Sequence, residues 1–153
     1  MIFSIKIIDE KIRECCGMPC CIGEIQIGEF KEDFEMPLEY WTIEDYKKQW
    51  KDGIERLNKN ERSCLVAEVQ DPEKAPWASL WVLYKEGDTV HVQNHVLRDK
   101  RFMKLIKKQP FTLETCYNLI TPREVISAGT GMEISEWITD LGSINEFLAK
   151  NEF

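Results

Sequence analysis

The sequence contains no run of about 18 apolar residues, the length that a membrane-crossing helix needs, so we expect no membrane segment. Its first ten residues include Asp9 and Glu10 and lack the basic start and apolar stretch of a secretory signal. Repeats, low-complexity stretches and Gly/Ser-rich linkers are also absent. The chain has 153 residues, 43% of them hydrophobic, which is enough for a buried core. We therefore expect residues 1–153 to form one domain, located in the cytoplasm.

Histidine is scarce, and catalytic motifs are missing. His91 and His95 are the only histidines. On a strand they share one side but lie about 13 Å apart, too far to ligate one metal ion. Either one needs a carboxylate partner for acid–base work, with Glu68 or Asp88 as candidates. A serine nucleophile elbow and a phosphate-binding glycine loop are absent. Because no convergent catalytic set can be assembled, we predict a protein that is not an enzyme and uses no cofactor.

Cysteine is plentiful but has an unusual spacing. Four of the six cysteines fall in the segment Cys15–Cys21. Paired zinc ligands usually have two residues between them and a longer loop between pairs, and this cluster has neither feature. A Cys-x-x-Cys redox motif is also absent. We expect a strand–turn–strand with Gly17 and Pro19 in the turn, thiols kept free by a reducing cytoplasm, and no metal site. Cys64 and Cys116 are expected in the core.

Hydrophobic periodicity predicts a chain rich in strands. Alternating or apolar segments bounded by turn residues are typical of strands. Glu86-Gly87-Asp88 predicts a tight hairpin between two of them. The expected strands are Met1–Ile8, Cys21–Phe30, Ser63–Gln70, Trp77–Tyr84, Thr89–Leu97 and Met132–Thr139.

One helix is strongly indicated. Thr42 and Asp45 resemble a capping box, and an apolar stripe at helical spacing follows up to Leu57. Shorter helices are expected over Asp99–Lys108, over Leu113–Ile120 and after a capping box formed by Ser143 and Glu146. The expected fold class is α+β, a largely antiparallel sheet with flanking helices.

The charge is unevenly distributed. The formal net charge is −7, which argues against general nucleic-acid binding. The segment Glu24–Asp45 holds eight acidic residues against Lys31 alone, a net charge of −7. The segment Arg98–Lys108 holds six basic residues against Asp99, a net charge of +5. Two interpretations of the acidic run stay open: a solvated loop leading into a helix N-terminus, or a surface that binds a partner.

Three long stretches resemble the immunity proteins of bacterial contact-dependent growth inhibition systems, the CdiI type. They are Pro37–Trp50, Trp81–Tyr84 with Val90–Asn94, and Ile134–Leu141. The resemblance extends from Phe30 to Phe147 and is greatest for the subgroup whose toxin is a ribosome-directed RNase similar to a nuclease colicin. The cysteine-rich segment Met1–Gly23 matches no pattern of the family.

The resemblance implies a non-enzymatic cytoplasmic protein that binds and blocks a toxin domain. It also implies a β-rich fold similar to the Whirly fold. A nuclease toxin presents a basic surface to RNA, and an acidic inhibitor complements that surface. No binding motif transfers from the family, so the candidate toxin-binding residues rest on charge: Glu32, Asp33, Glu35 and Glu39, with Glu136 and Asp140 as a second group.

A protein that binds single-stranded nucleic acid through the basic helix at residues 98–108 is the alternative function. The sequence leaves the oligomeric state open.

Overall fold

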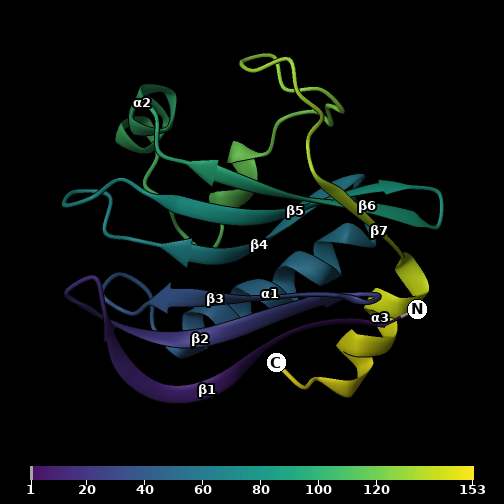
Figure 1. Cartoon of the computed structure of the whole chain (residues 1–153), viewed down its shortest axis with the longest axis horizontal. Coiled ribbons are helices and arrows are strands. Elements are labelled where there is room, and N and C mark those ends of the chain that lie inside the picture. Colours follow the sequence, from purple (N-terminus) through teal and green to yellow (C-terminus); the bar gives the residue numbers. More distant parts are fainter. Residues whose placement is uncertain (1) are drawn as a thin grey trace.

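The computed structural model describes residues 2–153 and contains two antiparallel sheets (Figure 1). The first sheet has the order β1-β2-β3, formed by β1 (Phe3–Cys15), β2 (Met18–Ile27) and β3 (Phe30–Pro37). The second has the order β4-β5-β6-β7, formed by β4 (Arg62–Val69), β5 (Ala78–Glu86), β6 (Thr89–Leu97) and β7 (Glu136–Asp140). With three α-helices around them, these sheets confirm the predicted α+β class, although the strands form two sheets instead of one.

The cysteine-rich hairpin turns at Cys16 and Gly17, where the φ angles are 53° and 80°. A two-residue turn that matches the strand twist needs positive φ at both positions. Proline cannot supply this angle, because its ring holds φ near about −65°. Pro19 therefore lies within β2, and its predicted place in the turn is wrong. Met1, the first residue of the predicted N-terminal strand, lies outside the described residues.

Strand β3 was not predicted, and it contains the centre of the acidic run. The interpretation of this part of the run as a solvated loop is therefore wrong. Phe34 and Met36 are buried, while Asp33 and Glu35 between them are exposed. This alternation is typical of an antiparallel strand with one solvated face. Because β3 pairs only with β2, it is an edge strand of the first sheet.

Helix α1 (Ile43–Leu57) holds the two sheets beside each other, and its predicted capping box is confirmed. The Tyr46 hydroxyl donates to the carbonyl of Pro37 at 2.7 Å and accepts from the amide of Val69 at 3.3 Å. The Trp50 indole donates to the carbonyl of Val66 at 2.8 Å, and its ring meets Phe34 edge to face. Figure 1 shows β3 and β4 side by side with α1 behind them. Side chains from α1, and not ladder hydrogen bonds, connect these two strands.

Aromatic packing joins the sheets at the other end of β3. Phe30 stacks on Trp137 of β7 with ring centroids 4.2 Å apart, and Trp81 of β5 contacts both rings edge to face. The tryptophans of the first two family-like stretches, Trp41, Trp50 and Trp81, are buried and belong to the core.

The C-terminal third differs most from the predicted elements. Helix α2 (Lys100–Lys108) confirms the helix predicted over Asp99–Lys108, with Asp99 as its cap, but the predicted helix at 113–120 is only a short 3-10 turn, Cys116–Leu119. The predicted final strand is shorter and begins at Glu136. The last helix, α3 (Leu141–Lys150), is capped by Asp140 and not by Ser143, because the Asp140 carboxylate accepts from the Ser143 amide at 2.7 Å. Among the described residues, no helix combines the length and apolarity needed to cross a bilayer.

Candidate functional site

An acidic groove lies between β3 and the second sheet, with a volume of about 270 Å³. We define it by four carboxylates: Glu32, Asp33 and Glu35 of β3, and Glu68 of β4. Three of these four are predicted site residues, and the fold brings them together on one edge strand. The remaining lining residues are Phe34, Ala67, Trp77, Ser79, Trp81, Asn94 and Val96.

Glu68 is the inner carboxylate of the groove. It is half-buried, and the Trp77 indole nitrogen donates to its Oε2 at 3.3 Å. Burial raises the pKa of Glu68 above its ordinary value, and the carboxylates of Glu35 and Glu32 raise it further. Ionisation of Glu68 is therefore opposed first by burial and then by the two neighbouring carboxylates.

The groove carboxylates lack cationic partners. In residues 2–153, no lysine or arginine forms an ion pair with any of the four. The guanidinium of Arg98 lies over the ring of Trp77 at 5.5 Å, and so it contacts the ring beside Glu68 and not the carboxylates. An arriving lysine or arginine side chain would find a half-buried carboxylate, which attracts a cation more strongly than an exposed one. The arrangement is thus suited to binding a basic group.

The other predicted site residues lie outside the groove and have partners. Glu39 forms an exposed ion pair with Lys74 at 3.3 Å. Glu136 accepts from Nη2 and Nε of Arg123, at 2.6 and 2.8 Å, and from Gln93 at 2.7 Å. These contacts, with that of Arg123 first, lower the pKa of Glu136 to about 2. Asp140 serves as the cap of α3, and this role lowers its pKa.

The two histidines have partners other than those predicted. His91 Nδ1 lies 3.1 Å from Glu136, and His91 Nε2 lies 3.6 Å from Glu86. His95 Nε2 lies 2.9 Å from the Gln93 side-chain oxygen. Neither of the candidate partners, Glu68 and Asp88, pairs with a histidine, and strand register instead places β7 with Glu136 beside His91.

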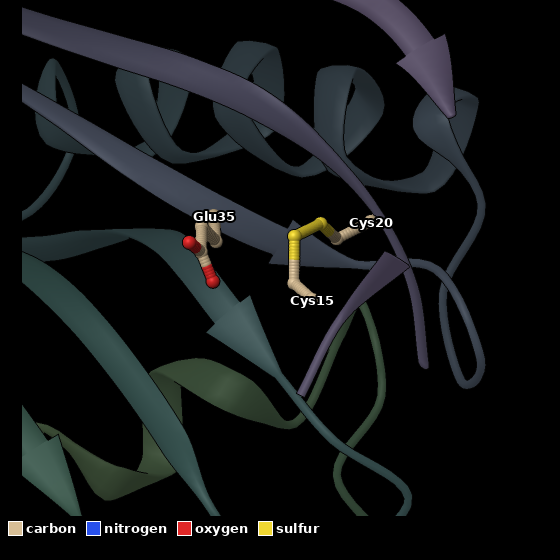
Figure 2. Close-up of side chains that lie close together, drawn as sticks. All are labelled: Cys15, Cys20 and Glu35. Carbon is tan, nitrogen blue, oxygen red and sulfur yellow. A yellow bond between two sulfur atoms is a disulfide. The ribbon is translucent and has the colours of Figure 1, made fainter. Parts of the chain in front are cut away.

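A second cluster lies where the cysteine hairpin meets β3 (Figure 2). Cys15 and Cys20 are joined by a disulfide, so the expectation that all thiols are free is wrong for this pair. The two sulfur atoms and a Glu35 carboxylate oxygen all lie within 4.8 Å of one another. Cys16, Cys21, Cys64 and Cys116 are free, and the last two are buried as predicted.

Glu68 and Trp77 are groove residues that the sequence did not place in the toxin-binding group, since Glu68 was considered only as a partner for a histidine. A signal was present in the segment Cys64–Val69, because Glu68 is the only charged residue in an otherwise apolar strand. A charged side chain at such a position is costly to bury and needs a reason. The three β3 carboxylates lie near Glu68 only because α1 contacts both β3 and β4.

Comparison with known proteins identifies the family. Residues 36–147 match the model of the CdiI N-terminal domain. The chain is 37% identical over 126 residues to the immunity protein CdiI of Enterobacter cloacae subsp. cloacae, covering 82% of each protein. The chain belongs to the CdiI family. This CdiI-family chain also matches the fold of a chain in the CdiA-CT/CdiI toxin and immunity complex from Enterobacter cloacae, with a TM-score of 0.82, 31% identity and 98% coverage of both chains.

These matches confirm the predicted CdiI resemblance, while the Whirly-like fold and the RNase subgroup stay predictions. The family model begins at Met36, directly after Glu35. It therefore includes the β4 side of the acidic groove in this CdiI-family chain but not the three β3 carboxylates. The cysteine hairpin also lies outside the matched range, as the sequence predicted.

Proposed function

We propose that this chain is an immunity protein that binds and neutralises the C-terminal toxin domain of a cognate contact-dependent inhibition effector in the cytoplasm. The observation that carries the proposal is the match over 98% of both chains to a chain of the CdiA-CT/CdiI complex. The family relationship at 37% identity supports the same function. The protein acts by occupying the toxin and performs no catalysis of its own.

The acidic groove is the proposed centre of the toxin-binding surface. Its four carboxylates make no ion pair within residues 2–153, so a basic partner can neutralise them without breaking existing pairs. Glu39 extends the surface beyond β3 through an exposed pair that a partner can exchange at little cost. Glu136 and Asp140 form the predicted second group, with smaller expected contributions because both already hold structural contacts.

The proposed partner is a basic nuclease domain that acts on RNA. An enzyme that binds the phosphate backbone of RNA needs a cationic surface. Complementary charge then accelerates association and disfavours non-cognate partners. Because the immunity protein has a net charge of −7, it suits such a toxin as a whole and not only at the groove.

The alternative, single-stranded nucleic-acid binding by α2, has weaker structural support. Stacking on exposed aromatic rings supplies much of the affinity in such proteins. Phe102, the only aromatic residue of α2, is buried. A gel shift with single-stranded oligonucleotides at low and moderate salt tests this function, and tight salt-dependent binding would favour it over the toxin proposal.

Co-expression with the toxin domain of the cognate effector tests the main proposal. We expect a stable equimolar complex and rescue of growth. Failure of both would contradict the proposal. As a matched pair for the surface, Glu32→Lys/Asp33→Lys/Glu35→Lys reverses the charge of three groove residues, while Glu55→Lys/Glu114→Lys/Glu152→Lys makes the same charge change at exposed positions elsewhere.

A further inference from the structure

Three strands place two sulfur atoms and a carboxylate at one point of the first sheet. Cys15 ends β1, Cys20 lies in β2, and Glu35 lies in β3. Figure 2 shows the Glu35 side chain beside the sulfur pair. Cys20 is fully buried, Cys15 is partly buried, and Glu35 is exposed. The cluster is therefore closed on its sulfur side and open to solvent at the carboxylate.

We propose that, in the reduced chain, Cys15, Cys20 and Glu35 bind a thiophilic divalent cation, zinc. The four-residue spacing between the two cysteines lies within the range seen for paired zinc ligands. Among the four cysteines of the hairpin, Cys15 and Cys20 are the pair that the fold brings together. The proposed site does not rest on clustered acidic residues or on a single thiol. It combines two thiols and a carboxylate that come from three strands.

The separation of the ligand atoms suits a tetrahedral ion. Bonds of about 2.3 Å to sulfur and about 2.0 Å to oxygen place neighbouring ligand atoms roughly 3.5–3.8 Å apart. The three ligand atoms already lie within 4.8 Å of one another. Small side-chain rotations after the two sulfurs separate would reach this geometry. Water fills the fourth position on the exposed side.

Formation of the site is chemically balanced. Two molecules of a cellular thiol such as glutathione reduce the Cys15–Cys20 disulfide to two thiols and leave as their own disulfide. The zinc ion then displaces the two thiol protons, which pass to solvent, and Glu35 binds as its carboxylate. The reduced state follows from the cytoplasmic location that forms part of the proposed function, because cytoplasmic thiols are kept reduced.

The remaining cysteines of the hairpin supply controls. Cys16 is exposed at the turn, and Cys21 is buried with its sulfur 3.9 Å from that of Met36. Neither belongs to the ligand group. Replacement of Cys16 therefore changes one thiol of the same hairpin while leaving the proposed ligands in place.

Titration of the full reduced chain with Co²⁺, in a phosphine reductant that supplies no thiol, tests the proposal. We expect one equivalent of Co²⁺ to bind with thiolate-to-metal charge-transfer absorption, and stoichiometric Zn²⁺ to displace it. Cys15→Ser should abolish the absorption, Glu35→Gln should weaken Co²⁺ binding at least about tenfold, and Cys16→Ser should leave it unchanged. Circular dichroism of each variant verifies that it is folded.

Three results would overturn the proposal: no charge-transfer absorption from the reduced chain, absorption that persists in Cys15→Ser, or loss of absorption in Cys16→Ser. Recovery of Cys15 and Cys20 as a disulfide from acid-quenched, alkylated cells would also overturn it. Failure here is distinguishable from failure of the toxin proposal, because Cys15→Ser leaves Glu32, Asp33 and Glu68 unchanged and frees Glu35 from the metal, so this variant is expected to bind the toxin domain at least as well as the wild type.

Discussion

At the scale of single residues, the protein uses its carboxylates in two opposite ways. Glu136 accepts from Arg123 and Gln93, so its charge contributes to the stability of the fold. Glu68 is half-buried with two further carboxylates facing it, so its charge opposes folding. A charge that costs stability in the free protein is available to a cationic partner. This contrast separates a structural acid from an acid placed for binding.

Replacement of Glu68 by glutamine is expected to strengthen the fold and weaken the complex. The pKa of Glu68 is raised in the fold, so ionisation at pH 7 costs stability, and Glu68→Gln should gain up to about 1 kcal/mol in urea unfolding. The same change should weaken toxin binding about tenfold or more, because a half-buried charge pair is lost. A variant that is less stable and binds normally would contradict this role.

Toxin affinity is also expected to fall with pH. A bound cation favours ionised Glu68, so association releases a proton where free Glu68 is partly protonated, and affinity drops as pH falls through its raised pKa. Calorimetric Kd values between about pH 7.5 and about pH 5 should show a steeper dependence for the wild type than for Glu68→Gln. Parallel curves would exclude Glu68 as the titrating group.

Glu136→Gln should destabilise the free protein by about 1–2 kcal/mol at pH 7, after allowance for solvent screening. The folded pKa of about 2 lies below the ordinary value of 4.5, so this stability is present above about pH 4.5 and is lost as pH falls toward about 2. Urea unfolding of wild type and variant across this range should converge at the acid end. A difference that is independent of pH would indicate lost packing and not lost charge.

At the scale of elements, α1 determines where the groove forms. Its Tyr46 and Trp50 bond to carbonyls of β3's last residue and of β4, which places two unpaired edges beside each other. The helix approaches β4 closely at Gly53, where a Cβ atom would collide with the Cys64 carbonyl oxygen. The position of the acidic groove therefore depends on the contact between α1 and β4.

Gly53→Ala tests this contact. In an exposed helix interior the change from glycine to alanine stabilises by about 1 kcal/mol. Here we expect destabilisation of about 1–3 kcal/mol, because the backbone of β4 must move away. Thermal unfolding measures the effect, with Lys48→Ala on the exposed face of α1 as the control. An increase in Tm for Gly53→Ala would show that α1 does not pack at this distance.

At the scale of the whole molecule, the elements that the sequence predicted correctly are those with a clear local pattern of residues. The meander β4-β5-β6 and the helix α1 follow from apolar periodicity and a capping box, and both are present. Strand β3 was missed because the acids Glu32, Asp33 and Glu35 interrupt its apolar alternation and imitate a loop. That residues 1–153 form one domain stays a prediction.

The candidate site was predictable only in part, for a physical reason. Charge density along the chain indicated Glu32, Asp33 and Glu35. Glu68 is 33 residues beyond Glu35 in the sequence, and it joins them through the packing of α1 against both sheets. The Cys15–Cys20–Glu35 cluster likewise depends on strand register, which spacing alone does not specify.

The affinity of the groove variant for the cognate toxin domain tests the central claim most directly. Glu32→Lys/Asp33→Lys/Glu35→Lys should weaken binding at least about a hundredfold and abolish growth rescue, because each reversed charge repels a basic partner. Glu55→Lys/Glu114→Lys/Glu152→Lys should stay within about a few fold of wild type. Equal Kd values for the groove variant and this control would contradict the assignment of the acidic groove as the toxin-binding surface.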